Sequence, residues 1–112
     1  MKKEYMIKKN YDISYIIKKK NSVANKYFVM YKLQNKQTEH FRIAVSVSKK
    51  IGNAVVRNRL KRQIKSVIYN NRFHINKNYD ILIIARKGIE DLEFSKLQES
   101  LINCLKKAKL YD

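Results

Sequence analysis

The chain has 112 residues, enough for one domain of ordinary size, and 45% of them are hydrophobic, which excludes a disordered chain. Its single cysteine, Cys104, excludes an intrachain disulfide and a cysteine-based metal cluster, and is typical of a reducing cytoplasm. The net charge of +17 is extreme for this length and favours a polyanionic partner. No apolar run approaches the length of about 18 residues that spans a membrane, and the basic first residues lack the apolar stretch of a signal peptide.

The first half of the chain predicts one helix and two strands. Residues 10–20 place three isoleucines at helical intervals, the pattern of a short amphipathic helix. Residues 27–33 are rich in aromatic and β-branched side chains, which favours a strand. A polar turn is expected over residues 34–40. Residues 41–48 then alternate apolar and polar side chains, which predicts a second, half-buried strand.

A longer helix is predicted from residue 52 to about residue 69, with Asn53 as its N-cap. One face of this helix is apolar and carries Val56, Leu60, Ile64 and Val67. The opposite face is polar and carries Asn58, Lys61, Arg62, Lys65 and Tyr69. The helix is therefore expected to bury one face and to expose a basic one.

The last third of the chain predicts a loop, a strand and a helix. Residues 70–78 are polar, whereas residues 81–85 form the unbroken apolar run of a central strand covered on both sides. Apolar side chains at helical spacing mark a helix over residues 94–108. Because the strand at 79–86 follows a helix, it is expected to pair in parallel with an earlier strand. Helices over one face of a small mixed sheet make a two-layer α/β (α+β) sandwich, a single domain over residues 1–112.

The basic charge is densest in residues 49–65, KKIGNAVVRNRLKRQIK, where seven of seventeen residues are Lys or Arg and none is acidic. Lysine outnumbers arginine by 20 to 6 in the whole chain, yet Arg57, Arg59 and Arg62 fall within six positions. Arginine pairs bidentately with phosphate, whereas lysine offers a mobile point charge. The two asparagines of this segment suit sugar and base edges. The segment therefore predicts an RNA-binding surface.

This segment also resembles the "RNR" signature of the bacterial ribonuclease P protein family. The signature reads KKIGNAVVRNR at residues 49–59 and is followed by LKR. The flanking segments agree in order: SVAN at 22–25, FVMY at 28–31, SVSKK at 46–50 and IIAR at 83–86. The resemblance covers nearly the whole chain.

The resemblance implies both a fold and a function. The fold is like the second domain of a small-subunit ribosomal protein, with a short extra strand near the start and a left-handed β-α-β crossover, against the usual right-handed rule. The implied function is that of the small subunit of a ribonucleoprotein whose large RNA cleaves precursor tRNA. The 5′ leader is removed by metal-assisted hydrolysis, with Mg²⁺ held mainly by the RNA and no organic cofactor.

The residues expected to bind the catalytic RNA are the basic and amide side chains of the 49–65 segment: Lys49, Lys50, Asn53, Arg57, Asn58, Arg59, Lys61, Arg62 and Lys65. The resemblance places the leader in a cleft between the sheet and the first helix, lined by Ile13, Ile17 and Tyr31. The family usually has phenylalanine at the two isoleucine positions. Stacking a base on an aromatic ring is worth about 1–3 kcal/mol, so this chain is expected to hold the leader there by apolar packing. Ordinary core packing is an equal alternative for Tyr31 and the favoured one for the two isoleucines.

Catalysis by the protein itself is the main contrast. No metal-binding or phosphate-loop motif is present, and His40 and His74 lie in polar, turn-like segments. Three carboxylates, those of Asp12, Glu39 and Asp80, could converge in space for two-metal chemistry. A second alternative is a non-enzymatic RNA-binding module, such as a ribosomal or RNA-chaperone protein. We expect catalysis to reside in the RNA, and a cytoplasmic, monomeric protein that binds the catalytic RNA one to one, without a membrane.

Overall fold

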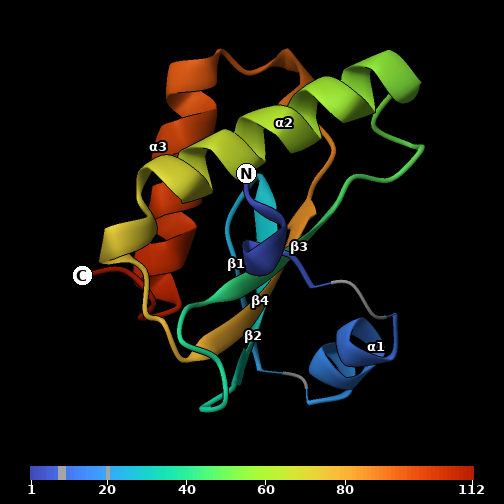
Figure 1. Ribbon diagram of the computed structural model, residues 1–112. Coiled ribbons are helices and arrows are strands. Elements are labelled where there is room, and N and C mark those ends of the chain that lie inside the picture. Colours follow the sequence, from blue (N-terminus) through green and yellow to red (C-terminus); the bar gives the residue numbers. More distant parts are fainter. Residues whose placement is uncertain (8–9, 20) are drawn as a thin grey trace.

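The computed structural model describes residues 1–7, 10–19 and 21–112. Four strands form one sheet in the order β1-β2-β4-β3 (Figure 1). The strands are β1 (Ser22–Ala24), β2 (Phe28–Gln34), β3 (Arg42–Ser46) and β4 (Tyr79–Ala85). The helices are α1 (Asn10–Lys18), α2 (Ala54–Asn70) and α3 (Phe94–Lys107). Three short 3-10 turns complete the described elements: η1 (Lys3–Tyr5), η2 (Arg72–His74) and η3 (Ile89–Asp91).

The last strand lies in the middle of the sheet, as its apolar sequence predicts. β4 pairs antiparallel with β2, placing Ile83 opposite Met30, and parallel with β3, placing Ile83 opposite Val45. The parallel pairing across α2 confirms the expected β-α-β unit. Its left-handed sense stays a prediction. β1 is the short extra strand that the resemblance implied, and it pairs antiparallel with β2.

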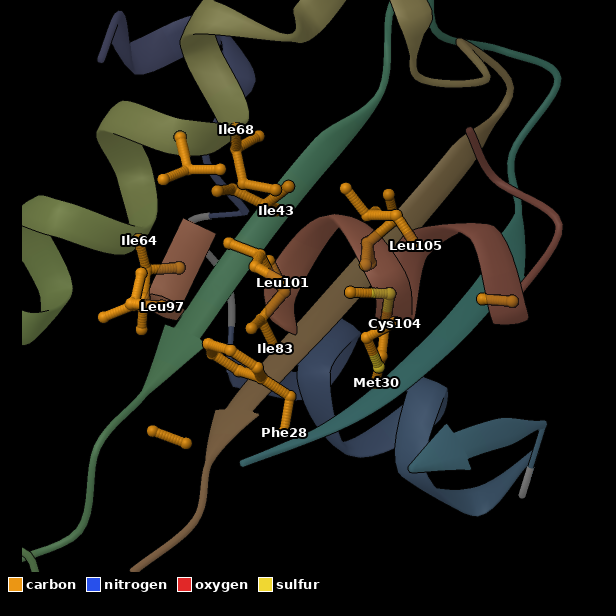
Figure 2. Close-up of a cluster of buried hydrophobic side chains, with 14 of the residues drawn as sticks. Phe28, Met30, Ile43, Ile64, Ile68, Ile83, Leu97, Leu101, Cys104 and Leu105 are labelled. Atoms are coloured by element: carbon orange, nitrogen blue, oxygen red, sulfur yellow. The ribbon is translucent and has the colours of Figure 1, made fainter. Parts of the chain in front are cut away.

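One face of the sheet carries the main core, under α2 and α3. Figure 2 shows the alternate side chains of β2 and β4, among them Phe28, Met30 and Ile83, meeting those of the two helices. The helices contribute Leu60, Ile64, Val67 and Ile68 from α2 and Leu97, Leu101, Cys104 and Leu105 from α3. The apolar face predicted for the long helix is therefore the buried one.

The first helix departs from the expected arrangement, because α1 packs on the opposite face of the sheet from α2 and α3 (Figure 1). Ile16 of α1 is buried there against Ala44 and Leu82. The physical reason lies in β4, whose Leu82 and Ile84 are apolar on this face too, so that it must also be covered. The two-layer sandwich of α2, α3 and the sheet is present, and α1 adds cover on the second side.

Candidate nucleic-acid interface

The start of α2 is fixed by two neighbouring residues. The Oδ1 atom of Asn53 accepts a hydrogen bond from the Val56 backbone N–H at 3.0 Å, which confirms the predicted N-cap. A Cβ atom on Gly52 would lie 2.9 Å from the Val56 Cγ1 atom, so only glycine permits this close approach. Arg57 then donates from its Nε to the Gly52 carbonyl at 3.2 Å. The first turn and its arginine are thereby held in one orientation.

The outward face of α2 forms a basic hollow of about 430 Å³. Four residues predicted to bind RNA line it together, namely Asn58, Lys61, Arg62 and Lys65. The remaining lining residues are Met1, Ser66, Tyr69 and Asn70. None of the eight is a carboxylate, so the hollow gathers three cations and two amides without an internal counter-charge. We call this surface the basic hollow.

Arg59 lies apart from the basic hollow, although it belongs to the same signature. Its Nη2 donates to the Glu90 carbonyl at 3.1 Å, which ties α2 to η3. Its Nε is buried and has no hydrogen-bond partner among the described residues. The half-buried guanidinium of Arg59 therefore holds η3 against α2 and does not project into solvent. Helical periodicity alone places residue 59 on a flank of the helix and leaves this orientation open.

The turn before α2 meets the loop after β4. Lys49 and Lys50 are exposed in that turn, and the Lys50 carbonyl accepts a hydrogen bond from Lys87 Nζ at 3.0 Å. Lys87 also pairs with Glu90 at 3.0 Å. The hydrogen bond from Lys87, followed by backbone hydrogen bonds, lowers the pKa of the Glu90 carboxyl from its ordinary value of 4.5. Lys87 is a basic residue of this region that the sequence motif does not include.

The residues expected in the leader cleft are partly brought together on the α1 side of the sheet. Ile13 and Tyr31 are half-buried and pack against the same small cluster, which contains Ile16 and Leu82. Ile17 does not join that cluster and leaves 42% of its surface exposed. Ile13 and Tyr31 therefore have a packing role as well as an accessible side, whereas Ile17 is free to meet a ligand.

The carboxylates considered for two-metal chemistry do not assemble in the described part of the chain. Asp80 is 4% exposed and is held by Arg42 through two contacts, Nε to Oδ1 at 2.9 Å and Nη2 to Oδ2 at 2.6 Å. Glu39 is exposed near His40. The side chain of Asp12 lies outside the described residues. Residues 1–7, 10–19 and 21–112 contain no group of three or more His, Cys, Asp or Glu side chains that could hold a metal ion.

Comparison with known proteins decides the family. The family model described as Ribonuclease P matches residues 1–109. The chain belongs to the ribonuclease P protein family. The ribonuclease P protein component of Streptococcus gordonii is 49% identical over 111 residues, covering 99% of this chain and 92% of that protein. That of Streptococcus pneumoniae is 43% identical, covering 99% and 89%.

Solved ribonuclease P proteins share the whole fold. The Staphylococcus aureus protein is 46% identical and superposes with a TM-score of 0.90, covering 96% of this chain and 98% of that one. A mutant of that protein, described as defective in mRNA degradation activity, is 47% identical with a TM-score of 0.92 and covers 97% and 92%. The Thermotoga maritima protein is 31% identical with a TM-score of 0.84 and covers 91% and 96%.

Family membership settles the coarse function. The chain is the protein subunit of an endoribonuclease that matures the 5′ end of tRNA, and in this family the RNA subunit performs the cleavage. Its partners are the ribonuclease P RNA and precursor tRNA. The alternative of a ribosomal or RNA-chaperone module is thereby set aside. Among the helices of the described residues, none combines the length and apolar character needed to cross a membrane.

Proposed function

We propose that the basic hollow of α2 docks the ribonuclease P RNA, while the α1 side of the sheet receives the 5′ leader of precursor tRNA. The observation that carries this proposal is the convergence of Lys61, Arg62 and Lys65 on one surface of about 430 Å³ without a carboxylate. The ion pairs seen among the described residues involve Arg42, Lys87 and Lys96, and none of them uses Lys61, Arg62 or Lys65, so these three cations are available to an external anion. An RNA backbone supplies such an anion at regular spacing.

Within this docking surface the residues have different tasks. The guanidinium of Arg62 and the ammonium groups of Lys61 and Lys65 contact phosphate, and Asn58 adds an amide for sugar or base edges. Arg57, held against the Gly52 carbonyl, and the exposed Lys49 and Lys50 extend the surface around the start of α2. Asn53 contributes through its cap, because its Oδ1 is occupied by the helix backbone. Arg59 acts as a positioning residue through its bond to the Glu90 carbonyl.

The leader is held on the other side of the sheet, by packing rather than by stacking on the first helix. Tyr31 offers the aromatic edge of the cleft, and Ile17 offers an exposed apolar side chain on α1. Ile13 supports the cleft from beneath because it is half-buried. Separate faces let one protein bind the catalytic RNA and the leader at the same time. Because only precursor tRNA carries a leader, this arrangement favours precursor over mature tRNA.

The finer features of the complex follow the same logic. Mg²⁺ is held mainly by the catalytic RNA, and the protein screens phosphate repulsion around it. The buried carboxylate of Asp80 supports this, because both of its oxygens already accept hydrogen bonds from the Arg42 guanidinium. One protein molecule binds one RNA as a monomer, since a net charge of +17 opposes self-association. The complex acts in the cytoplasm, without an organic cofactor and without a membrane.

Two substitutions test the division of labour. Arg62→Ala should weaken assembly with the catalytic RNA about tenfold or more, because a charge-assisted contact to phosphate is worth roughly 1.5–3 kcal/mol. Tyr31→Ala should leave assembly intact but weaken binding of precursor tRNA by the assembled complex. Lys96→Ala on α3 removes one exposed charge elsewhere and serves as the control. Indistinguishable defects of the Arg62 and Tyr31 variants in both assays would refute the assignment of two faces.

A further inference from the structure

Phe73 is the most exposed large apolar side chain in the described part of the chain, at 86%. A single exposed apolar residue is common and needs no explanation. Phe73 differs because a cation is already stacked beside it: the guanidinium carbon of Arg72 lies 4.5 Å from the Phe73 ring centroid and 4.0 Å from that of Tyr69. The ring thus belongs to an ordered stack that continues from the end of α2 and stops at solvent.

The segment that carries Phe73 is held from both sides. Arg72 Nη1 donates to the Tyr69 carbonyl at 2.8 Å, which fixes the guanidinium between the rings. On the far side, the His74 ring stacks on Tyr111 at 5.3 Å, and the Asp112 N–H donates to the His74 carbonyl at 2.7 Å. The exposed ring is therefore presented by an ordered backbone, and binding to it costs little conformational entropy.

Beside this ring lies a second hollow of about 340 Å³, which we call the aromatic hollow. Its aromatic walls include Tyr5, His40 and Phe73, and its polar groups include Arg72, Lys77 and Glu39. The Tyr5 and His40 rings lie 4.4 Å apart, so the wall is itself a packed unit. Ring faces with two cations suit a base and its phosphate, and the carboxylate of Glu39 can accept a hydrogen bond from an N–H group of the base.

Tyr69 connects the two hollows through its ring contacts. Tyr69 lines the basic hollow, contacts Arg72 and meets the Tyr5 ring edge-on at 5.9 Å. We propose that the aromatic hollow binds one unpaired nucleotide of the RNA that docks on the basic hollow, with its base stacked on Phe73 and its phosphate met by Arg72 and Lys77. This inference rests on the docking proposed above and extends the same surface by one nucleotide site.

An RNA nucleotide fits this site better than a protein does. A second copy of the chain would bring a further charge of +17 to a surface that is already basic. A base inside a duplex hides its faces, whereas an unpaired base exposes both and stacks on aromatic rings. The combination of ring, guanidinium and ammonium around one hollow is the chemistry of single-stranded RNA recognition.

The absence of tryptophan from the chain makes a direct test available. Phe73→Trp creates a sole tryptophan at the site, and Phe94→Trp places one at a partly exposed phenylalanine on α3 as the matched control. Each full-length variant is titrated with the ribonuclease P RNA, and the tryptophan emission is recorded. We expect RNA to quench the emission of Phe73→Trp and to leave that of Phe94→Trp unchanged. Equal responses, or an unquenched Phe73→Trp in a complex whose formation is shown independently, would overturn the site.

Affinity measurements separate this inference from the docking on which it rests. Phe73→Leu should weaken RNA binding about tenfold (~1.4 kcal/mol) while Phe73→Tyr retains it, because only the tyrosine keeps a ring face. The exposure of Phe73 means that neither change removes core packing, which thermal melts verify. If Arg62→Ala weakens binding and Phe73→Leu does not, the nucleotide site is wrong and the docking face stands. If Phe73→Leu acts only by changing self-association in sedimentation, the surface binds protein and the inference fails.

Discussion

At the scale of single residues, the three arginines of the RNR signature occupy different environments. Arg62 faces the basic hollow, Arg57 bonds the Gly52 carbonyl, and Arg59 bonds the Glu90 carbonyl with its Nε buried. A motif of identical residue types therefore combines a ligand-binding group with groups that hold neighbouring backbone. A loss of RNA binding in an Arg59 variant would report a displaced η3 as well as a lost charge.

Cys104 gives a pH prediction at this scale. Burial raises the pKa of its thiol from 9.0 to about 11, against a smaller opposing effect of Lys107. Below about pH 9 the thiol is protonated in both the folded and the unfolded chain and contributes no pH dependence. Above that value the unfolded chain loses the proton while the folded chain keeps it, so the free energy of unfolding should fall by up to about 1.4 kcal/mol per pH unit until about pH 11.

Urea unfolding of the wild type and of Cys104→Ala, from pH 8 to pH 11, isolates this slope from the titration of tyrosines and lysines. The alanine variant starts from a lower stability because it leaves a cavity in the core. The difference in the free energy of unfolding between the wild type and Cys104→Ala should become smaller as the pH rises. A constant difference would show that the thiol ionises equally in both states. Native Cys104 should also resist alkylation at neutral pH, since the thiolate is the reactive form.

At the scale of secondary-structure elements, α1 gives the clearest prediction. Ile17 is exposed on the helix beside the proposed leader cleft, so a larger ring can replace it without overpacking the core. Ile17→Phe should strengthen binding of precursor tRNA about fivefold or more, because base stacking contributes roughly 1–3 kcal/mol. The assembled complex is titrated with precursor and with mature tRNA, which lacks the leader. An equal gain for both tRNAs, or none for the precursor, would place the leader elsewhere.

The elements themselves were largely predictable because their signals are local. The alternation around Ile43 and the periodicity around Leu60 define β3 and α2 within a few residues. β1 has three residues, too few for a period, and it entered only through the family resemblance. The side of the sheet taken by α1 was missed because it depends on how Ala44 and Leu82 line up across two strands. The alignment of residues on neighbouring strands is set by the tertiary structure, and the spacing of residues within one strand does not reveal it.

The candidate sites divide in the same way. Asn58, Lys61, Arg62 and Lys65 recur at helical spacing, and the fold brings them to one hollow as their positions predict. The aromatic hollow draws on η1, the segment before β3 and η2, which are far apart in sequence. The only local signal for it was one phenylalanine between Arg72 and His74 in a loop that is otherwise polar apart from Ile75. Sequence spacing cannot show that such a ring stays outside the core.

At the scale of the whole molecule, charge is coupled to stability. The net charge is +17, and residues 40–79 carry ten basic side chains and no carboxylate. An anion that binds the assembled basic face binds only the folded chain, and it stabilises that state by RT ln(1 + [L]/Kd), about 2.7 kcal/mol at a hundredfold excess. Sulfate should therefore raise the melting temperature more than chloride at equal ionic strength. Coincident melting curves in the two salts would mean that general screening accounts for the whole effect.

The central claim is that the outward face of α2 docks the catalytic RNA, and the salt dependence of RNA binding tests it most directly. A variant with Lys61, Arg62 and Lys65 changed to alanine is compared with one in which Lys36, Lys96 and Lys106, three exposed lysines on other elements, are changed. Each variant loses three positive charges. We predict that the slope of log Kd against log salt concentration decreases by about 2–3 in the α2 variant alone, because each lost phosphate contact removes roughly 0.7–0.9 from the slope. Equal decreases in the two variants would contradict the account.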